Sequence, residues 1–548
     1  MNSYDIFLIA AELLGAGVLF WLGGYAEQVR NSKWRICYAL PFALCLLAAA
    51  LSGFEISMLS VYLGAILLLG GFLLEKKTIR RTVSAAAGVL IAAALPVCLL
   101  YGGYRQPDFV KDFEKGFQAM KEHYVLSEHK GIDWDELYEK YLPRFEEADR
   151  AHDEELNYIA WTAFCQEFYD GHVSFTARKS EVEMAAQQRF CGKDYGLSLM
   201  TLSDGRTAAV NVQEGGALEA AGIRNGTIIT AWNGETISEA ADRAELTVMS
   251  FPDKDNEAFY RALLVAGMGE EEITITYLDD EGKACEVSVQ QQGFYYERLK
   301  ETMEILDQGL EAGNLSLTGI DEDTYVLRIK GMMYDTDSMA DGDYVAMQSQ
   351  LREQLLSLRQ EGAKNLIIDL RGNGGGSGAM VMALAELFAP EGEHYYVTDA
   401  VWDEQNACYQ KDEKTGTYMP GTVYTYQGED VWKDGEIVIL VNAQSVSASD
   451  HFVKVMRGME HVTVAGFTKP NGSAQGISVL ELESGALSFS ASLLLDQEGE
   501  VFIDSGTERI GGNDVDVRIP FDEEAVRALF DDGEDYLLKK VCMKMFTK

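Results

Sequence analysis

The chain has 548 residues, of which 47% are hydrophobic, and a formal net charge of −41, so it is long enough for more than two domains. Its first 104 residues carry five acidic and seven basic side chains, so the acidic excess lies in the remainder. A remainder this acidic repels nucleic acid, which argues against DNA or RNA as partners. The eight cysteines show no C-x-x-C spacing, and we predict neither a metal site nor a cofactor.

Residues 1–104 contain four apolar stretches, at roughly 5–24, 36–54, 56–74 and 83–102. Each is close to the ~20 residues that a helix needs to cross a bilayer. Basic residues cluster after the first and the third stretch, and such clusters face the cytoplasm. We therefore predict a multi-pass anchor of four transmembrane helices in the cell membrane, with everything after it on the extracellular or envelope side.

Residues 105–185 show a helical pattern. Val110, Phe113 and Phe117 recur at three- and four-residue steps, which is typical of a helix with one buried face. A later helix is predicted to end at Asp170-Gly171, a helix-stop and turn signal. His172 therefore lies at a junction between a helix and a strand, and it is one of only seven histidines available as a catalytic base.

Residues 186–292 combine short alternating strands with turns closed by glycine. The succession Gly-Ala-Leu, Ala-Gly-Ile, Gly-Thr-Ile-Ile and Asn-Gly in this region resembles a PDZ domain of the protease-associated type. That resemblance implies peptide binding, with backbone amides holding a C-terminal carboxylate while the peptide adds a strand. The residues implied are Tyr195, Gly196, Leu197, Ser198 and Leu199. A helical segment at 238–268 is placed to cover this groove, and a purely structural or regulatory unit is the alternative.

Residues 293–548 alternate between strand and helix, which predicts an α/β core with a mainly parallel sheet. In such sheets, sites lie beyond the carboxyl ends of the strands. Two loops follow predicted strands there: the glycine-rich loop Arg371–Gly378 and a serine-rich turn at 442–450. The whole chain is thus expected to be a multi-domain α/β protein.

The serine-rich turn joins the apolar strand 436–441 to a helix that begins near Asp450. A hydroxyl held at a helix N-terminus meets amide groups that favour developing negative charge, as an activated serine requires. A serine-rich helix cap is the simpler alternative. The glycine-rich loop lacks the Lys-Ser/Thr of a P-loop, so its exposed amides suit an oxyanion hole better than a phosphate site.

Three motifs in this order resemble the C-terminal processing (tail-specific) protease family of serine peptidases. They are Asp369-Leu-Arg-Gly-Asn-Gly-Gly-Gly376, Ser445-Val-Ser-Ala-Ser-Asp450 and Val464-Ala-Gly466, and the likeness covers about residues 107–546. The resemblance implies that Ser447 is the nucleophile. It also implies that the amide of Ala448 and that of Gly375 or Gly376 stabilise the oxyanion.

Two branches of this family use different residues as the general base, and both are alternatives for this chain. One branch uses a lysine about 25 residues after the serine, but Lys469 comes three residues early, which weakens a Ser447–Lys469 dyad. The other branch, which resembles the tricorn and chlamydial-type enzymes, uses a histidine from the helical region, and a glutamate near the C-terminus orients it. His172 and Glu508 match those positions. A neutral imidazole near pH 7 is able to take the serine proton.

We therefore expect a membrane-anchored serine endopeptidase that hydrolyses protein tails or unfolded proteins, with Ser447, His172 and Glu508 as its triad. Its partners would be protein or peptide substrates, and the lipid bilayer through residues 1–104. The alternatives are the Ser447–Lys469 dyad and a catalytically inactive relative that only binds peptides or other ligands.

Overall fold

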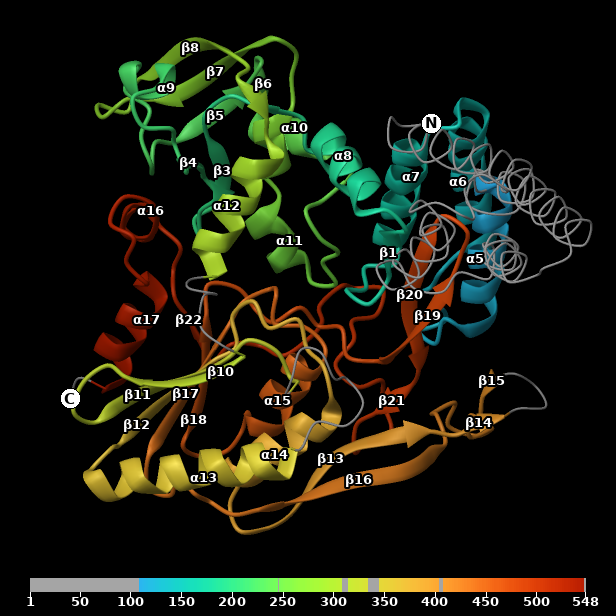
Figure 1. Ribbon diagram of the computed structural model, residues 1–548, viewed down its shortest axis with the longest axis vertical. Helices are drawn as coiled ribbons and strands as arrows, with labels where there is room; N and C mark the ends of the chain where they lie inside the picture. The colour runs from blue at the N-terminus through green and yellow to red at the C-terminus, as the bar shows by residue number, and fades with distance from the viewer. Residues whose placement is uncertain (1–107, 245, 308–313, 334–343, 404–407, 547–548) are drawn as a thin grey trace, which may run out of the picture. The chain divides into compact units, whose positions relative to one another are not determined.

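The computed structural model describes residues 108–244, 246–307, 314–333, 344–403 and 408–546 (Figure 1). Asp108–Lys548 form one compact unit. The four stretches predicted to cross a membrane lie outside the described residues. Within the described part of the chain, no helix is both long and apolar enough to span a bilayer.

Three helices open the described chain, and an aspartate side chain caps each of them by accepting amide hydrogen bonds in the first turn. Their apolar faces meet in a cluster of aromatic rings, in which Phe113 stacks on Phe145 with centroids 4.3 Å apart. The helices are α5 (Phe109–His123), α6 (Trp134–Ala151) and α7 (Glu154–Gln166).

A small antiparallel sheet ties these helices to the far end of the chain. Strand β1 (Ser174–Ala177) pairs with β20 (Gly485–Ser492), which also pairs with β19 (Gly476–Glu481). His172 lies two residues before β1, so this pairing places the histidine near residues that come more than 250 positions later.

The next region matches the part of the sequence that resembles a PDZ domain. Strand β3 pairs with β4, and β6-β5-β7-β8 form a four-stranded antiparallel sheet. Its strands are β2 (Lys193–Asp194), β3 (Ser198–Thr201), β4 (Thr207–Val210), β5 (Ile229–Trp232), β6 (Glu235–Thr236), β7 (Glu272–Leu278), β8 (Ala284–Gln290) and β9 (Gly293–Phe294). Its helices are α8 (Ser180–Cys191), α9 (Ala217–Ala220), α10 (Ile237–Asp242), α11 (Lys254–Tyr260), η3 (Leu264–Gly267) and α12 (Tyr296–Asp307).

A six-stranded sheet with the order β10-β11-β12-β17-β18-β22 forms the centre of the last region. Strand β10 is antiparallel to β11, and every other neighbouring pair is parallel. The strands are β10 (Leu315–Gly319), β11 (Thr324–Ile329), β12 (Asn365–Asp369), β17 (Glu436–Val441), β18 (Val462–Gly466) and β22 (Val517–Arg518).

Alternate residues of the central strands face two different cores, because successive side chains of a strand point to opposite faces. In β17, Ile437 and Ile439 join one hydrophobic cluster, whereas Val438 and Leu440 join the other. Helices packed against the first cluster are α13 (Tyr344–Glu361), α14 (Gly378–Phe388) and α15 (Ala448–Met456). In Figure 1, α13 and α14 run along one side of the sheet. Burial on both faces explains the continuous apolar run of β17.

The remaining elements extend from this sheet. A long hairpin of β13 (Gly392–Ala400) and β16 (Pro420–Gly428) is accompanied by β21 (Leu494–Leu495). The short elements are β14 (Trp402–Asp403), β15 (Cys408–Tyr409), α16 (Glu523–Phe530), α17 (Tyr536–Val541) and η4 (Cys542–Phe546).

Candidate active site

Ser447 lies in the turn between β17 and α15, at the carboxyl end of the parallel strands. Its backbone has φ 62° and ψ −121°, a conformation that costs a non-glycine residue about 1–3 kcal/mol. The turn is held by a hydrogen bond from the Ser447 amide to the Ser473 carbonyl at 2.9 Å, and by one from the His451 amide to the Ser447 carbonyl at 3.0 Å. The half-buried Ser447 side chain does not cap α15, although Ser447 occupies the N-cap position. The simple helix-cap interpretation is therefore wrong for Ser447.

The glycine-rich loop after β12 packs directly against this turn. A Cβ on Gly375, whose φ is 96°, would lie 2.6 Å from the Cβ of Ser447, so a side chain has no room there. The Gly375 amide donates to Oδ1 of Asn373 at 2.9 Å. The amides of Gly376 and Ala448 make no hydrogen bond among the described residues. Free amides beside a nucleophile are suited to an oxyanion, so Gly376 and Ala448 fit that role better than Gly375.

His172 is buried at the junction between α7 and β1, and its Nδ1 has no hydrogen-bond partner among the described residues. Its amide donates to Oδ1 of Asp170 at 2.9 Å. The preceding amide, that of Gly171, donates to Oγ of Ser473 at 2.7 Å, and the Ser473 carbonyl accepts from Ser447. Ser473 thus contacts both the histidine junction and the serine turn. Burial lowers the pKa of His172, with a smaller opposing effect from Asp170, which keeps the imidazole neutral near pH 7.

Three buried carboxylates surround this junction and form what we name the acid cluster: Asp170, Asp450 and Asp504. Oδ2 of Asp504 accepts from the Ala474 amide and from Nε2 of Gln475, both at 2.9 Å, while its Oδ1 is unpaired among the described residues. Burial, followed by the charge of Asp170, raises the pKa of Asp504 to about 7. Burial also raises the pKa of Asp450 well above its usual range. Unpaired, strongly shifted acids are typical of functional sites.

Glu508, expected from the sequence to orient His172, is exposed in a turn, and Nδ1 of His172 has no hydrogen-bond partner among the described residues. The buried carboxylate of the same segment is that of Asp504, four residues earlier. Its signal in the sequence is the apolar run Val501-Phe502-Ile503, which ends at this aspartate. The spacing of the related family points instead to the next glutamate, Glu508.

Two other candidate bases are fully engaged elsewhere. Nζ of Lys469 pairs with Asp253 at 3.2 Å and with Asp514 at 3.0 Å. Burial acts to lower the pKa of Lys469, but these two acids outweigh it and raise the pKa, so the amine stays protonated. His451, one helical turn after Ser447, hydrogen bonds through both ring nitrogens, to the Tyr396 hydroxyl and the Ala474 carbonyl, each at 2.7 Å. Both groups thus have partners elsewhere, whereas Nδ1 of His172 has none among the described residues.

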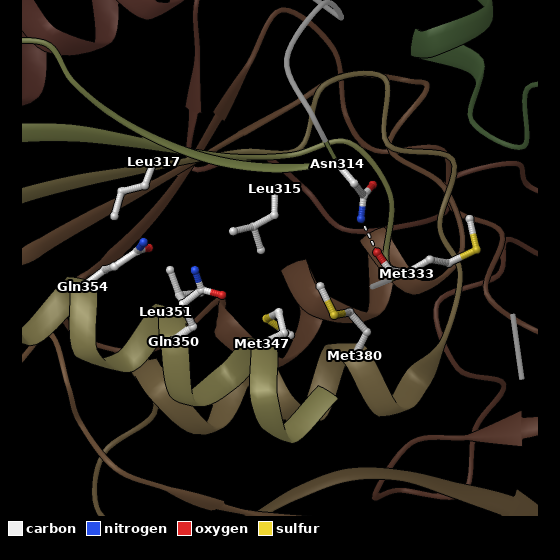
Figure 2. Close-up of a pocket in the computed structure, with 9 residues that line it drawn as sticks. All are labelled: Asn314, Leu315, Leu317, Met333, Met347, Gln350, Leu351, Gln354 and Met380. Carbon is white, nitrogen blue, oxygen red and sulfur yellow. Dashed lines mark hydrogen bonds between the residues drawn. The ribbon is translucent and has the colours of Figure 1, made fainter. Parts of the chain in front are cut away.

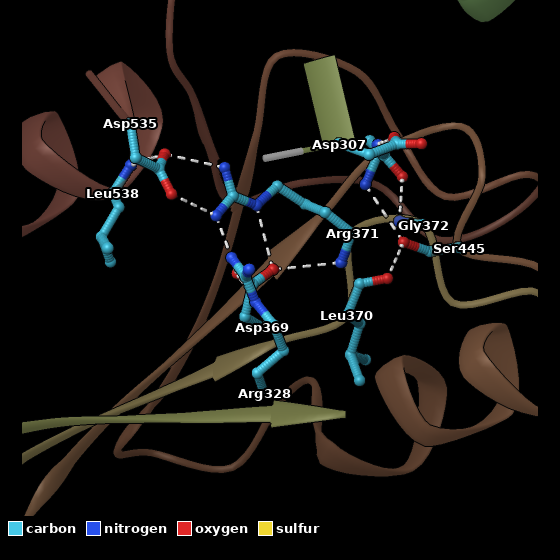
Figure 3. Close-up of polar contacts among 10 residues, drawn as sticks. Asp307, Arg328, Asp369, Leu370, Arg371, Gly372, Ser445, Asp535 and Leu538 are labelled. Carbon is cyan, nitrogen blue, oxygen red and sulfur yellow. Dashed lines mark hydrogen bonds and ion pairs between the residues drawn. The ribbon is translucent and has the colours of Figure 1, made fainter. Parts of the chain in front are cut away.

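A second group of charges lies behind the glycine-rich loop, and we name it the arginine cluster: Arg328, Asp369, Arg371 and Asp535. Asp369 and Arg371 are buried, and the other two are half-buried. Figure 3 shows the Arg371 guanidinium between the carboxylates of Asp369 and Asp535, at 2.7 and 2.6 Å. Burial alone would raise the pKa of Asp369, but the two arginines outweigh it and hold that pKa below its usual range. This cluster joins the end of β12 to the start of α17, since Asp535 is the N-cap of α17.

Asp307, the last residue of α12, connects that helix with the serine turn. Its Oδ1 accepts from Nδ2 of Asn442 at 2.7 Å and from Nε2 of Gln444 at 3.0 Å. Asn442 in turn accepts from the Gly372 amide at 3.1 Å. One carboxylate therefore links α12 to both loops at the candidate site.

The five residues expected to bind a peptide carboxylate are all buried. Tyr195, Leu197, Ser198 and Leu199 are each at most 2% exposed. The Gly196 amide donates to Oδ1 of Asp194 at 2.8 Å. Within β3, the Ser198 hydroxyl meets those of Thr302 and Tyr295 at 2.8 and 2.9 Å. These groups are already satisfied within the chain, so the described conformation does not present them as an open groove.

Comparison with known proteins agrees with this geometry. Residues 324–509 match the model of peptidase family S41, and residues 106–165 match that of the Tricorn protease C1 domain. A tail-specific protease of Haemophilus influenzae is 27% identical over 123 residues, which are 22% of this chain and 15% of that protein. The aligned part thus spans well under two thirds of that relative.

Two solved structures share the fold. Mature CPAF has 14% identity and a TM-score of 0.52 over 80% of this chain and 97% of its own. Mature CPAF complexed with lactacystin has 14% identity and a TM-score of 0.51 over 80% and 98%. Both the serine turn and the glycine-rich loop lie within residues 324–509, the part that matches the model of peptidase family S41.

Proposed function

We propose that the protein is a serine endopeptidase in which Ser447 attacks the peptide carbonyl and His172 acts as the general base. The observation that carries this proposal is the strained Ser447 turn, joined through Ser473 to a buried, neutral histidine. Lys469 is held by two acids, so a lysine base is the weaker hypothesis.

The chemistry follows from these positions. The Ser447 oxygen forms a bond to the carbonyl carbon while its proton passes to His172, and the resulting oxyanion accepts from the amides of Ala448 and Gly376. His172 then gives the proton to the leaving amine as the C–N bond breaks. Water, deprotonated by the same histidine, hydrolyses the acyl-enzyme and restores Ser447.

We assign the orienting carboxylate to Asp504 in place of Glu508. Asp504 is buried in the same cluster as His172 and has an unpaired oxygen, as His172 has an unpaired Nδ1. A carboxylate that accepts the Nδ1 proton, directly or through one water, fixes the tautomer that leaves Nε2 free to act as a base.

The setting that we propose for this activity is the cell membrane. Residues 1–104 would anchor the chain in the bilayer, with the peptidase on the extracellular or envelope side. The substrates would be protein tails or unfolded proteins, delivered in part by the PDZ-like region, whose candidate groove would have to open. Asp307 gives such an opening a direct connection to the serine turn.

The test is hydrolysis of an unfolded protein such as casein by the purified full-length chain. Ser447→Ala is expected to lower the rate at least ~10³-fold, because the covalent step is lost. Ser449→Ala is the matched control: it removes a buried, unpaired hydroxyl two residues away and should leave the rate within about threefold. Equal rates for the wild type and Ser447→Ala would exclude Ser447 as the nucleophile. Binding of casein without any cleavage would instead favour the inactive, binding relative.

A further inference from the structure

A cavity of about 520 Å³ lies between the edge strand β10, helix α13 and the start of α14. Its size falls within the range of roughly 300–1,000 Å³ that is usual for ligand pockets. In Figure 2, the leucines of β10 face the methionine and leucine side chains of the two helices across this space. The apolar lining consists of Leu315, Leu317, Met333, Met347, Leu351 and Met380.

The cavity is next to the candidate site. A Cβ on Gly376 would lie 2.8 Å from Cγ of Met333, which is part of the cavity wall. A Cβ on the neighbouring Gly375 would lie 2.6 Å from the Cβ of Ser447. Two consecutive glycines therefore separate the cavity wall from the nucleophile, and an extended peptide advances about 3.3 Å per residue. A side chain of a peptide bound at Ser447 is thus within reach of the cavity.

We propose that this cavity is the main specificity pocket of the peptidase and that it binds a large apolar side chain of the substrate. The residue concerned is the one that contributes the scissile carbonyl, with leucine, methionine and phenylalanine as the favoured types. This inference rests on the proposed function, because it assumes that the peptide is bound for attack by Ser447.

The chemistry of the lining decides the class of side chain. None of the lining residues that the structure describes is charged, so among them an ionised side chain would be buried without a partner, at a large cost. Methionine side chains are flexible and polarizable, so they adapt to aliphatic and aromatic groups alike. The amides of Gln350 and Gln354 lie on the exposed outer rim, where a peptide backbone would pass.

The experiment compares fluorogenic peptides that differ only at the residue before the cleaved bond, which is alanine, leucine, phenylalanine or glutamate. The full-length wild type is expected to cleave the leucine and phenylalanine peptides with kcat/KM roughly 10- to 100-fold above the alanine peptide, and the glutamate peptide least. Leu315→Trp fills the cavity from the edge strand. It should remove the preference for leucine and phenylalanine over alanine.

The matched control is Ile320→Trp, which adds the same indole at a 44% exposed position just beyond β10, outside the cavity. It should keep the wild-type preference. Met347→Phe, on the opposite wall, provides a second filling variant in case Leu315→Trp unfolds. An unchanged preference in both filling variants would overturn the specificity pocket and leave the peptidase function standing.

A binding measurement separates the two proposals. Fluorescence anisotropy of the same peptides on the Ser447→Ala chain should show tighter binding of the leucine peptide, and Leu315→Trp should abolish the difference. If no Ser447-dependent cleavage occurs but this binding difference is found, the proposed peptidase function fails while the pocket stands. If neither cleavage nor a binding difference is found, both proposals fail.

Discussion

Two groups of buried charge flank the serine turn, and they are built in opposite ways. In the arginine cluster, two guanidinium groups face two carboxylates at 2.5–3.1 Å, and every charge has a partner of opposite sign. In the acid cluster, three carboxylates share one region, and Asp450 and Asp504 each keep an unpaired oxygen. The first group pulls the pKa of Asp369 down, whereas in the second group the pKa values of Asp450 and Asp504 rise.

The difference indicates a division of roles. A buried charge that is fully paired fixes the position of two elements, here β12 and α17, and its loss leaves the partner uncompensated. Buried acids without such partners are unfavourable for stability and are retained where they serve chemistry. Mutations in the arginine cluster should therefore reduce stability, and mutations around the acid cluster should reduce activity.

The largest effect is expected at His172. His172→Ala should lower kcat/KM roughly 10³- to 10⁴-fold, because the general base is lost, with little change in unfolding free energy. Lys469→Ala is the comparison variant and should retain most of the activity, since its amine is protonated and paired with Asp253 and Asp514. Steady-state kinetics on one peptide measures both variants. The reverse outcome would restore the Ser447–Lys469 dyad.

The next effect concerns stability. Arg371→Met should lower the free energy of unfolding by about 3–5 kcal/mol, because it leaves the buried carboxylate of Asp369 with an incomplete set of partners. Arg352→Met breaks the more exposed pair with Glu429 and should cost less than about 1 kcal/mol. Urea unfolding of both variants makes the comparison. Equal losses of unfolding free energy in the two variants would mean that the arginine cluster stabilises the fold no more than the exposed pair does.

An intermediate effect is expected at Asp504. Asp504→Asn removes the carboxylate and should lower kcat/KM roughly 10²-fold. The wild-type rate should rise with pH through about 7, since the carboxylate must ionise to orient His172, and the variant should lack this rise. Glu508→Gln is the control and should behave as the wild type. If Glu508→Gln loses activity and Asp504→Asn does not, the assignment of the orienting acid is reversed.

The same substitution should also change how stability depends on pH. An unfolded aspartate ionises near pH 4, whereas burial keeps folded Asp504 protonated up to about 7. Between these values the folded state holds the extra proton, so this group makes wild-type stability fall as pH rises from about 4 to 7. Asp504→Asn should remove that part of the slope, which thermal unfolding across this pH range measures. An unchanged slope would show that Asp504 does not titrate in this window.

Local patterns in the sequence predicted many of the helices and strands. Apolar runs predicted the buried strands, as in 366–370 for β12 and 436–441 for β17, because a strand covered on both faces needs no alternation. Helical spacing indicated helices in the region of α5 to α7 in the same way. The likeness to a known family placed Ser447 and the glycine-rich loop as neighbours, and their contact is seen in the structure.

What sequence spacing missed depends on burial. Glu508 and Asp504 are four residues apart and chemically alike, and only the path of the chain buries one and exposes the other. The sequence likewise does not indicate that the amide of Gly375 is already taken by Asn373, or that the hydroxyl of Ser198 is satisfied by Thr302. Such details follow from the side-chain partners that the folded chain brings to each group.

The smallest effect is the one that tests whether the serine turn is itself strained. At φ 62° and ψ −121°, replacing Ser447 by glycine should relieve about 1–3 kcal/mol, against roughly 0.5–1 kcal/mol of extra chain entropy in the unfolded state. Ser447→Gly should therefore be about 1 kcal/mol more stable than Ser447→Ala in urea unfolding, although both are inactive. At Ser449, inside α15, the order should invert, because glycine in a helix costs about 1 kcal/mol relative to alanine. If glycine is the less stable residue at both positions, Ser447 is not strained, and the energetic contrast between the serine turn and the well-paired arginine cluster behind it disappears.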